Sequence, residues 1–198
     1  SFVFSADTKL DPEAVAFDSL EAVAGNFHLS GGATYKRGLA GHLPWFAGKL
    51  EANAIDLAPL FAARDEANNG KWPVRALDWS MLGAFEGEAG LKAGAISAGT
   101  LRLEQADMRL ALSGGALTVS PASAAFADGR ASFGLRIEGV QAKEPGIGLT
   151  ATVEDADIAR TGARLFGVAP GTGRADLGIQ LQGQGRSWLA LVSSLAGT

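Results

Sequence analysis

The strongest constraint in this sequence is a period-two alternation of apolar and polar residues, which fills most of its second half. Leu101 and Leu103 share one face of their run. Phe133, Leu135 and Ile137 share one face of a later run. Such alternation is typical of strands that bury one face and expose the other to water. The pattern predicts an all-β fold with a mainly antiparallel, curved, groove-like extended sheet and one or two short helices.

Turn signals separate these runs. Ser113–Gly115 contains two glycines, and Asp128-Gly129 suits the positive φ angles of a tight hairpin turn. The alternation changes phase at Gln105–Ala106, which predicts a bulge or turn at that point. We expect successive runs to pair as hairpins.

Two short helices are predicted near the C-terminal end. The first lies near Asp155–Gly167, where acidic residues at the start favour the helix dipole and a glycine ends the pattern. The second begins after Ser187, a favourable N-cap residue, and Gly197 is expected as its C′ residue.

The composition excludes several classes of protein. The chain has 198 residues and no Cys, so it holds no disulfide framework, thiolate zinc site or Cys nucleophile. Its net charge is -4 at pH 7, and its Lys and Arg residues are scattered. A nucleic-acid binder normally carries a basic patch, so we expect no nucleic-acid partner. The length allows one all-β domain, or one domain plus part of another.

No catalytic or metal-binding motif is present in the sequence. His28 and His42 are the only His residues, and the HEXXH and GXSXG motifs are absent. The acidic residues Glu154, Asp155 and Asp157 lack the spacing of an EF-hand loop, and we expect them to cap a helix. We therefore predict a protein that is not an enzyme, with no catalytic residues, no metal and no cofactor.

No apolar run approaches the ~20 residues that span a bilayer. No signal peptide is visible, and the chain starts at Ser1 rather than Met. We expect the chain to be a piece of a longer protein.

The last two-thirds of the chain shows an ordered series of features. It opens with WPV at residues 72–74 and LDWSML at residues 77–82, followed by the Gly-rich stretch FEGEAGLKAGAIS. A ladder then follows, in which paired Leu residues alternate with an acidic spacer, a Gly turn and small residues. Its sequence is LRLEQADMRLALSGGALTVSPASAAFADGRASFGLRIEG.

The tail GTGRADLGIQLQGQGRSWLALVSSLAGT completes the series. In it, Gly183, Gly185 and Ser187 precede a short helix that is followed by Gly197. Through these features, residues 72–198 resemble the C-terminal part of the AsmA family. The family commonly has Asn before the last glycine, where this chain has Ala196.

The resemblance implies a location and a role. AsmA-like proteins are large envelope proteins held in the inner membrane by an N-terminal helix, and their bodies lie in the periplasm. They are thought to form long β-grooves with an apolar lining, which help phospholipid reach the outer membrane. By this resemblance, residues 1–71 are a preceding β segment of the same groove. Residues 72–198 are the AsmA-like C-terminal β region, truncated at its end.

The resemblance also implies partners. They are phospholipid acyl chains, the rest of the parent chain, and the inner membrane through a missing N-terminal helix. Self-association through sheet edges is a further expectation, because an incomplete groove leaves strands unpaired. We expect the apolar face of the ladder to line the groove. Its candidate lining residues are Leu101, Leu103, Met108, Leu110, Leu112, Leu117, Val119, Phe133, Leu135, Ile137, Leu177, Ile179 and Leu181.

Alternation alone does not distinguish an open groove from a closed core. The leading interpretation is phospholipid transport between the inner and outer membranes, or outer-membrane homeostasis. The alternative is a structural or interaction β-domain, a closed sandwich or solenoid in envelope assembly with no lipid conduit. Solvent access to the apolar face of the ladder distinguishes the two.

Overall fold

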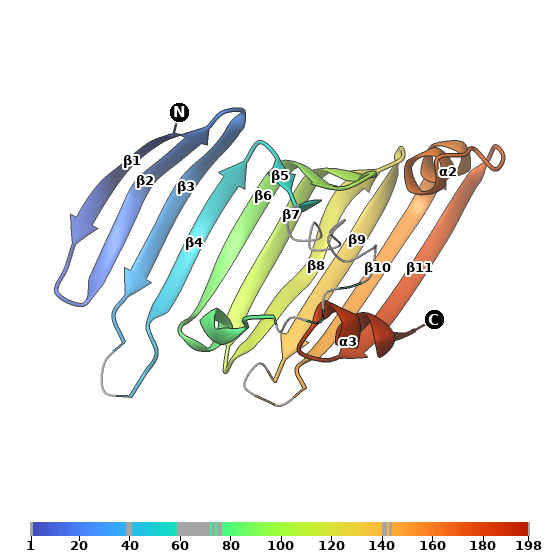
Figure 1. Cartoon of the computed structure of the whole chain (residues 1–198). Helices are drawn as coiled ribbons and strands as arrows, with labels where there is room; N and C mark the ends of the chain where they lie inside the picture. The colour runs from blue at the N-terminus through green and yellow to red at the C-terminus, as the bar shows by residue number, and fades with distance from the viewer. Residues whose placement is uncertain are drawn as a thin grey trace.

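The computed structural model describes residues 2–38, 41–58, 72, 74, 77–139, 142 and 144–197. These residues form one large sheet with short helices beside it (Figure 1). The strands are β1 (Phe2–Leu10), β2 (Ala14–Ala24), β3 (Phe27–Lys36), β4 (Trp45–Ala52), β5 (Ile55–Asp56), β6 (Glu86–Ala98), β7 (Leu101–Ser113), β8 (Ala116–Phe126), β9 (Gly129–Glu138), β10 (Gly146–Asp157), β11 (Arg174–Gln184) and β12 (Ala196–Gly197). The helices are the 3₁₀ helix η2 (Ser80–Gly83) and the α-helices α2 (Ile158–Phe166) and α3 (Trp188–Ser193).

The sheet is open, and its strand order follows the chain. The order is β1-β2-β3-β4-β6-β7-β8-β9-β10-β11-β12, with β5 paired beside β6. Neighbouring strands pair antiparallel, except that β4 and β5 both run parallel to β6. A parallel pair needs a crossover connection, and the chain between Ala52 and Glu86 makes it. The predicted all-β, mainly antiparallel fold with short helices is confirmed, whereas the parallel pairing was not predicted.

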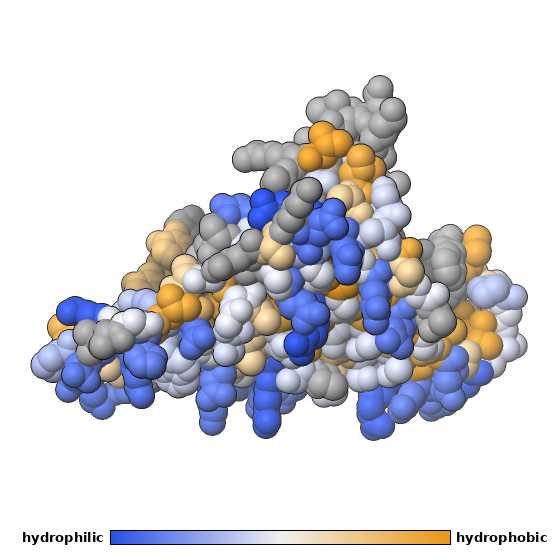
Figure 2. All heavy atoms as spheres, turned by 90° about the horizontal axis from the view of Figure 1, so that it is seen from below, coloured by the Kyte–Doolittle hydropathy of each residue, from blue (hydrophilic) through white to orange (hydrophobic). Residues whose placement is uncertain are grey.

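The register shows which side chains share a face, because directly paired residues lie on the same side of a sheet. In Figure 2, hydrophilic side chains follow one face of the sheet, along the lower margin of the view. We call this side the polar face and the opposite side the apolar face. One row of paired residues on the apolar face runs from β1 to β11 through Leu10, Val15, Tyr35, Phe46, Gly87, Leu112, Leu117, Ile137, Ile147 and Gly183.

A bulge keeps the apolar residues of β7 on one face. The backbone of Gln105 has a φ of 53°, and the register against β8 shifts between Glu104 and Asp107. Leu103 and Met108 are five positions apart, a spacing that puts two residues of a regular strand on opposite faces, yet Leu103 packs against the apolar cluster that contains Met108. The extra residue of the bulge makes this possible, so the bulge predicted from the change of phase is confirmed.

Both predicted α-helices form, and Asp157 and Ser187 cap them as predicted. The expectation that Glu154 and Asp155 also cap the first helix is wrong, because both lie in β10. The side chain of Asp157 accepts a hydrogen bond from the backbone N–H of Arg160 at 2.8 Å, and α2 ends at Gly167 in the left-handed conformation. The hydroxyl of Ser187 accepts a hydrogen bond from the N–H of Ala190 at 3.1 Å and caps α3. These side chains satisfy N–H groups that have no partner inside the helix.

The prediction that Gly197 is the C′ residue of the second helix is wrong. Helix α3 ends at Ser193, and Gly197 lies in β12, where it pairs with β11. The hydroxyl of Ser194 donates to the carbonyl oxygen of Gln184 at 2.7 Å and ties the helix end to β11. A Cβ on Gly197 would lie 2.2 Å from the carbonyl oxygen of Gln180. The glycine therefore serves a close approach of two strands.

The described core consists of two clusters on the apolar face. Ile55 and Leu57, from the crossover between β4 and β6, pack against the larger cluster. The smaller cluster lies where β8 turns into β9 and includes Ala156 near the start of α2. Most of the clustered residues are small, so a crossing segment can approach the sheet closely. The larger cluster is Ala93, Ile96, Ala106, Met108, Val119, Ala122 and Ala124, and the smaller is Phe126, Ala127, Ala131 and Ala156.

Candidate functional site

The predicted lining residues all lie on the apolar face. Direct pairing connects most of them across neighbouring strands, as in the row through Leu110, Val119 and Leu135. Leu101 and Leu103 join the same face through their packing against the smaller core cluster. The same register brings β10 into the face, because Leu149 pairs with Leu135 on one side and with Leu181 on the other.

The predicted lining covers only part of this face. It leaves out β10, although the residues of that strand stand between those of β9 and β11. It also leaves out the first half of the chain, where the alternation is less regular. The register alone reveals the residues that complete the face, namely Leu20, Leu29, Phe46, Leu50, Leu91, Ile147, Leu149 and Val153.

Burial divides the predicted lining into a covered centre and an open end. Ile137 is only 7% exposed, like the buried Met108, Leu112 and Val119. By contrast, Ile179 on β11 is 51% exposed. Its neighbour on the same face, Leu177, is 45% exposed. The remaining lining residues are half-buried: Leu101, Leu103, Leu110, Leu117, Phe133, Leu135 and Leu181.

The crossover between β4 and β6 covers part of the centre. Its residues Ile55 and Leu57 pack on the larger core cluster, and β5 pairs with β6. Further along, the Trp72 ring lies 6.2 Å from the ring of Trp188 in α3. The described parts of the crossover therefore contact the apolar face near β6, and they contact helix α3.

The two ends of the apolar face are open to solvent. At the β11 end, Leu177 and Ile179 are exposed on adjacent rows. At the β1 end, Phe2 is 69% exposed and Leu10 is 80% exposed, and Phe4 between them is also exposed. Contiguous exposed apolar side chains mark binding surfaces more often than isolated ones do. The open ends are therefore the parts of the face available to a ligand or partner.

The polar face carries charges that match one another across the strands. Lys92 stands directly opposite Asp107, and Arg130 stands opposite Glu154. Exposed ion pairs of this kind contribute only ~0–1 kcal/mol each. This pattern is that of a hydrated outer surface.

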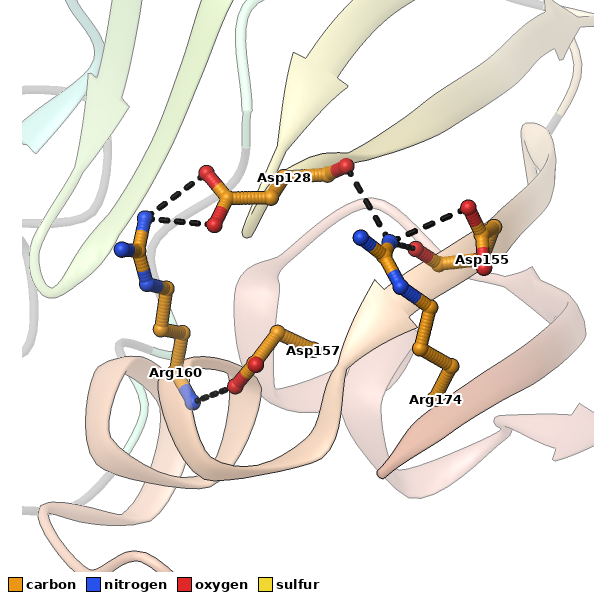
Figure 3. A network of polar contacts seen from close by, with 5 residues as sticks. All are labelled: Asp128, Asp155, Asp157, Arg160 and Arg174. Atoms are coloured by element: carbon orange, nitrogen blue, oxygen red, sulfur yellow. Dashed lines mark hydrogen bonds and ion pairs between the residues drawn. The ribbon is translucent and has the colours of Figure 1, made fainter. Parts of the chain in front are cut away.

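A network of polar contacts joins α2 to the ends of the strands (Figure 3). The guanidinium of Arg160 contacts both carboxylate oxygens of Asp128, at 2.7 and 2.6 Å. Arg174 contacts the carboxylate of Asp155 at 3.0 Å and donates to the backbone oxygen of the same residue. Asp157 completes the network as the N-cap of α2. Each arginine is matched by a carboxylate, so the network braces the helix rather than offering an anion site.

Other polar candidates also have structural partners. His28 lies 2.9 Å from the carboxylate of Glu21 on the exposed polar face. Arg186 donates to the carbonyl oxygen of Ala142 at 2.9 and 3.2 Å. Among the described residues, no three His, Asp or Glu side chains gather where they could hold a metal ion. None of the described helices has the length and apolarity needed to cross a membrane.

Comparison with protein-family models, with curated proteins and with solved structures finds no match to this chain. The class of the protein therefore comes from its own architecture. Its described residues form an open, single-sheet β protein with one apolar and one polar face, and the apolar face is open at both ends.

Proposed function

We propose that this chain is a non-enzymatic, lipid-binding segment of an AsmA-like envelope protein, and that its apolar face holds the acyl chains of phospholipids in transit between the inner and outer membranes. One observation carries the proposal. Rows of mainly apolar residues cross an open sheet, and two of the three large ones on β11, Leu177 and Ile179, stay exposed.

The proposed binding chemistry is hydrophobic. Each CH₂ group of an acyl chain that leaves water for an apolar surface contributes ~0.8 kcal/mol. Leu, Ile and Val side chains supply that surface without any specific polar contact. A charged headgroup stays in water beside the open edge of the sheet, where it needs no buried partner. This chemistry matches a face whose described rows carry no Asp, Glu, Lys or Arg.

The location and partners are part of the same proposal, and they rest on the resemblance of residues 72–198 to the AsmA family. The chain lies in the periplasm, and the full-length protein is anchored to the inner membrane by a helix outside this chain. Residues 1–71 contribute β1 to β5 to the same sheet as residues 72–198, as expected if both segments line one groove.

Native mass spectrometry with lipid extraction tests the proposal on protein purified from a Gram-negative host. Ile179→Glu places a charge on the open part of the apolar face. Gln180→Glu places the same charge on the next residue, which pairs with Thr150 on the polar face. We expect phospholipid to co-purify with the unmodified protein and with Gln180→Glu, and to be lost from Ile179→Glu. Far-UV circular dichroism of both variants checks that the fold survives.

One observation favours the alternative, a structural or interaction β-domain with no lipid conduit. The centre of the apolar face is packed as an ordinary core beneath Ile55 and Leu57. If lipid is absent from the unmodified protein, and added phospholipid vesicles transfer none to it, the lipid proposal is wrong. The structural alternative then explains the fold better.

A further inference from the structure

Arg164, in the last turn of α2, places a positive charge at the margin of the apolar face. Its guanidinium carbon lies 5.8 Å from the ring centroid of Phe126. Phe126 is 3% exposed and belongs to the smaller core cluster, against which Leu101 and Leu103 pack. In Figure 1, α2 lies at the upper end of β10 and β11. The charge therefore stands where the apolar face meets the turns at this end of the strands.

The guanidinium of Arg164 is not matched by an anion. One of its N–H groups donates to the backbone oxygen of Arg102 at 3.4 Å, which is long for a hydrogen bond. Arg160 and Arg174 nearby each contact a carboxylate. No carboxylate in the part of the chain that the structure describes forms an ion pair with Arg164. Because the side chain is half-buried, its charge is partly removed from water without a partner, which favours the binding of an anion.

Helix α2 holds this side chain in place. Asp157 caps the start of the helix, and Arg160 contacts the carboxylate of Asp128 in the turn between β8 and β9 (Figure 3). A Cβ on Gly162 would lie 2.2 Å from the Cδ of Pro170, so the chain that follows α2 packs closely against the helix. A binding group that is already positioned loses little freedom when its ligand arrives.

We propose that Arg164 binds the phosphate group of a phospholipid whose acyl chains lie on the apolar face. The inference rests on the proposed function, and it adds the chemical class of the headgroup and the margin of the sheet where the headgroup lies. A guanidinium donates two parallel N–H bonds to a phosphate, a geometry that an ammonium lacks. The phosphate remains partly in water, because Arg164 is only half-buried.

The apolar face beside Arg164 is suited to the acyl chains. Leu101, Leu103 and Val153 are half-buried and pack against the smaller core cluster. Val153 pairs directly with Leu177, an exposed residue of the proposed lipid surface. Because neighbouring strands lie ~4.8 Å apart, an acyl chain that starts beside β8 reaches β11 after ~14 Å. A phosphate at α2 and acyl chains on the exposed part of the face therefore belong to one lipid molecule.

Arg164 also has structural effects, which the test must separate from binding. A positive charge in the last turn stabilises the helix dipole, and a cation above an aromatic ring is favourable. Arg164→Lys keeps the charge for both effects and removes only the paired donors. Arg164→Gln removes the charge as well. Arg109→Gln is the matched control, because Arg109 is exposed on β7 and pairs with Gly90 on the polar face.

Titration calorimetry on delipidated protein tests the proposal with three probes. Dioctanoylphosphatidylglycerol carries phosphate and acyl chains, dioctanoylglycerol carries the same chains without phosphate, and glycerol 3-phosphate carries phosphate without chains. Arg164→Gln should weaken binding of the phospholipid about tenfold or more and leave binding of dioctanoylglycerol unchanged, which also shows that the apolar face is intact. Arg164→Lys should weaken the phospholipid less. Arg109→Gln should change neither, and glycerol 3-phosphate should bind much more weakly than the phospholipid.

Ile179→Glu separates this inference from the proposed function, because it should weaken both lipids. If it does so while Arg164→Gln binds the phospholipid normally, the phosphate assignment is wrong and the proposed function stands. Equal weakening of both lipids by Arg164→Gln would show that the arginine acts through packing, and would overturn the assignment. Glycerol 3-phosphate binding as tightly as the phospholipid would show a site for soluble phosphate esters instead. If the unmodified protein binds neither lipid, the proposed function is wrong and this inference is wrong with it.

Discussion

Ile137 and Ile179 are a matched pair for measuring how the apolar face is covered. They are the same residue type on the same face of one sheet, but Ile137 is 7% exposed and Ile179 is 51% exposed. Replacing each by Ala removes the same atoms. The difference between the two losses of unfolding free energy therefore reports the local packing.

The expected magnitudes follow from this burial. Ile→Ala at a closely packed site costs about 2–5 kcal/mol, because a cavity adds to the lost transfer energy. Full burial of an Ile side chain contributes about 1.5–3 kcal/mol. At Ile179 about half of this applies and no closed cavity forms, so Ile179→Ala should cost about 1 kcal/mol. The lost β-propensity is similar for both variants. Ile137→Ala should therefore cost about 1–4 kcal/mol more.

Equilibrium urea unfolding, followed by far-UV circular dichroism on delipidated protein, gives both values. The slope of free energy against urea should stay the same for all three proteins, because each unfolds the same surface. Equal losses for Ile137→Ala and Ile179→Ala would refute the reasoning. They would show that the β11 end of the face is covered as completely as β9.

Two further predictions concern stability and are checked by thermal unfolding. Gly129→Ala should lower the free energy of unfolding by about 1–3 kcal/mol, because the new Cβ would lie 2.4 Å from the carbonyl oxygen of Glu154. Gly178→Ala is the control. A Cβ at Gly178 would have no atom within 4 Å, so this variant should be nearly as stable as the unmodified protein. Asp157→Ala should cost about 1 kcal/mol by removing the cap on the N–H of Arg160, while Asp157→Asn keeps an acceptor and most of the stability. A neutral Gly129→Ala, or an Asp157→Asn as harmful as Asp157→Ala, would contradict these assignments.

The features predictable from the sequence depend on neighbouring residues. The alternation in β7 and β9 reflects the pleat of a strand, so the strands and their shared face followed from it. The bulge at Gln105 appeared as a change of phase, because one extra residue reverses the faces. The caps Asp157 and Ser187 act within three residues of their own positions. Each signal is complete within a short stretch of chain.

The features that were missed depend on residues far apart in the sequence. The alternation of β4 is the same whether its neighbour runs parallel or antiparallel, so the pairing of β4 with β6 left no local signal. The alternation of apolar and polar residues is also the same in the covered and the open parts of the face. Only the packing of Ile55 and Leu57 distinguishes the covered part. Gly197 was misassigned because a glycine serves equally well after a helix and where two strands approach closely.

The distribution of side-chain size over the apolar face bears on its use. Most of the buried hydrophobic residues are alanines. Four of them, Ala93, Ala106, Ala122 and Ala124, belong to the cluster on which Ile55 and Leu57 pack. Phe2, Phe4 and Ile179 are large, and they lie at the open ends. A face that served only as a closed core would gain most by burying its largest side chains, since stabilisation grows with the apolar area removed from water. Here the large side chains at the margins remain accessible, which is the arrangement that the proposed binding of acyl chains at the β11 end requires.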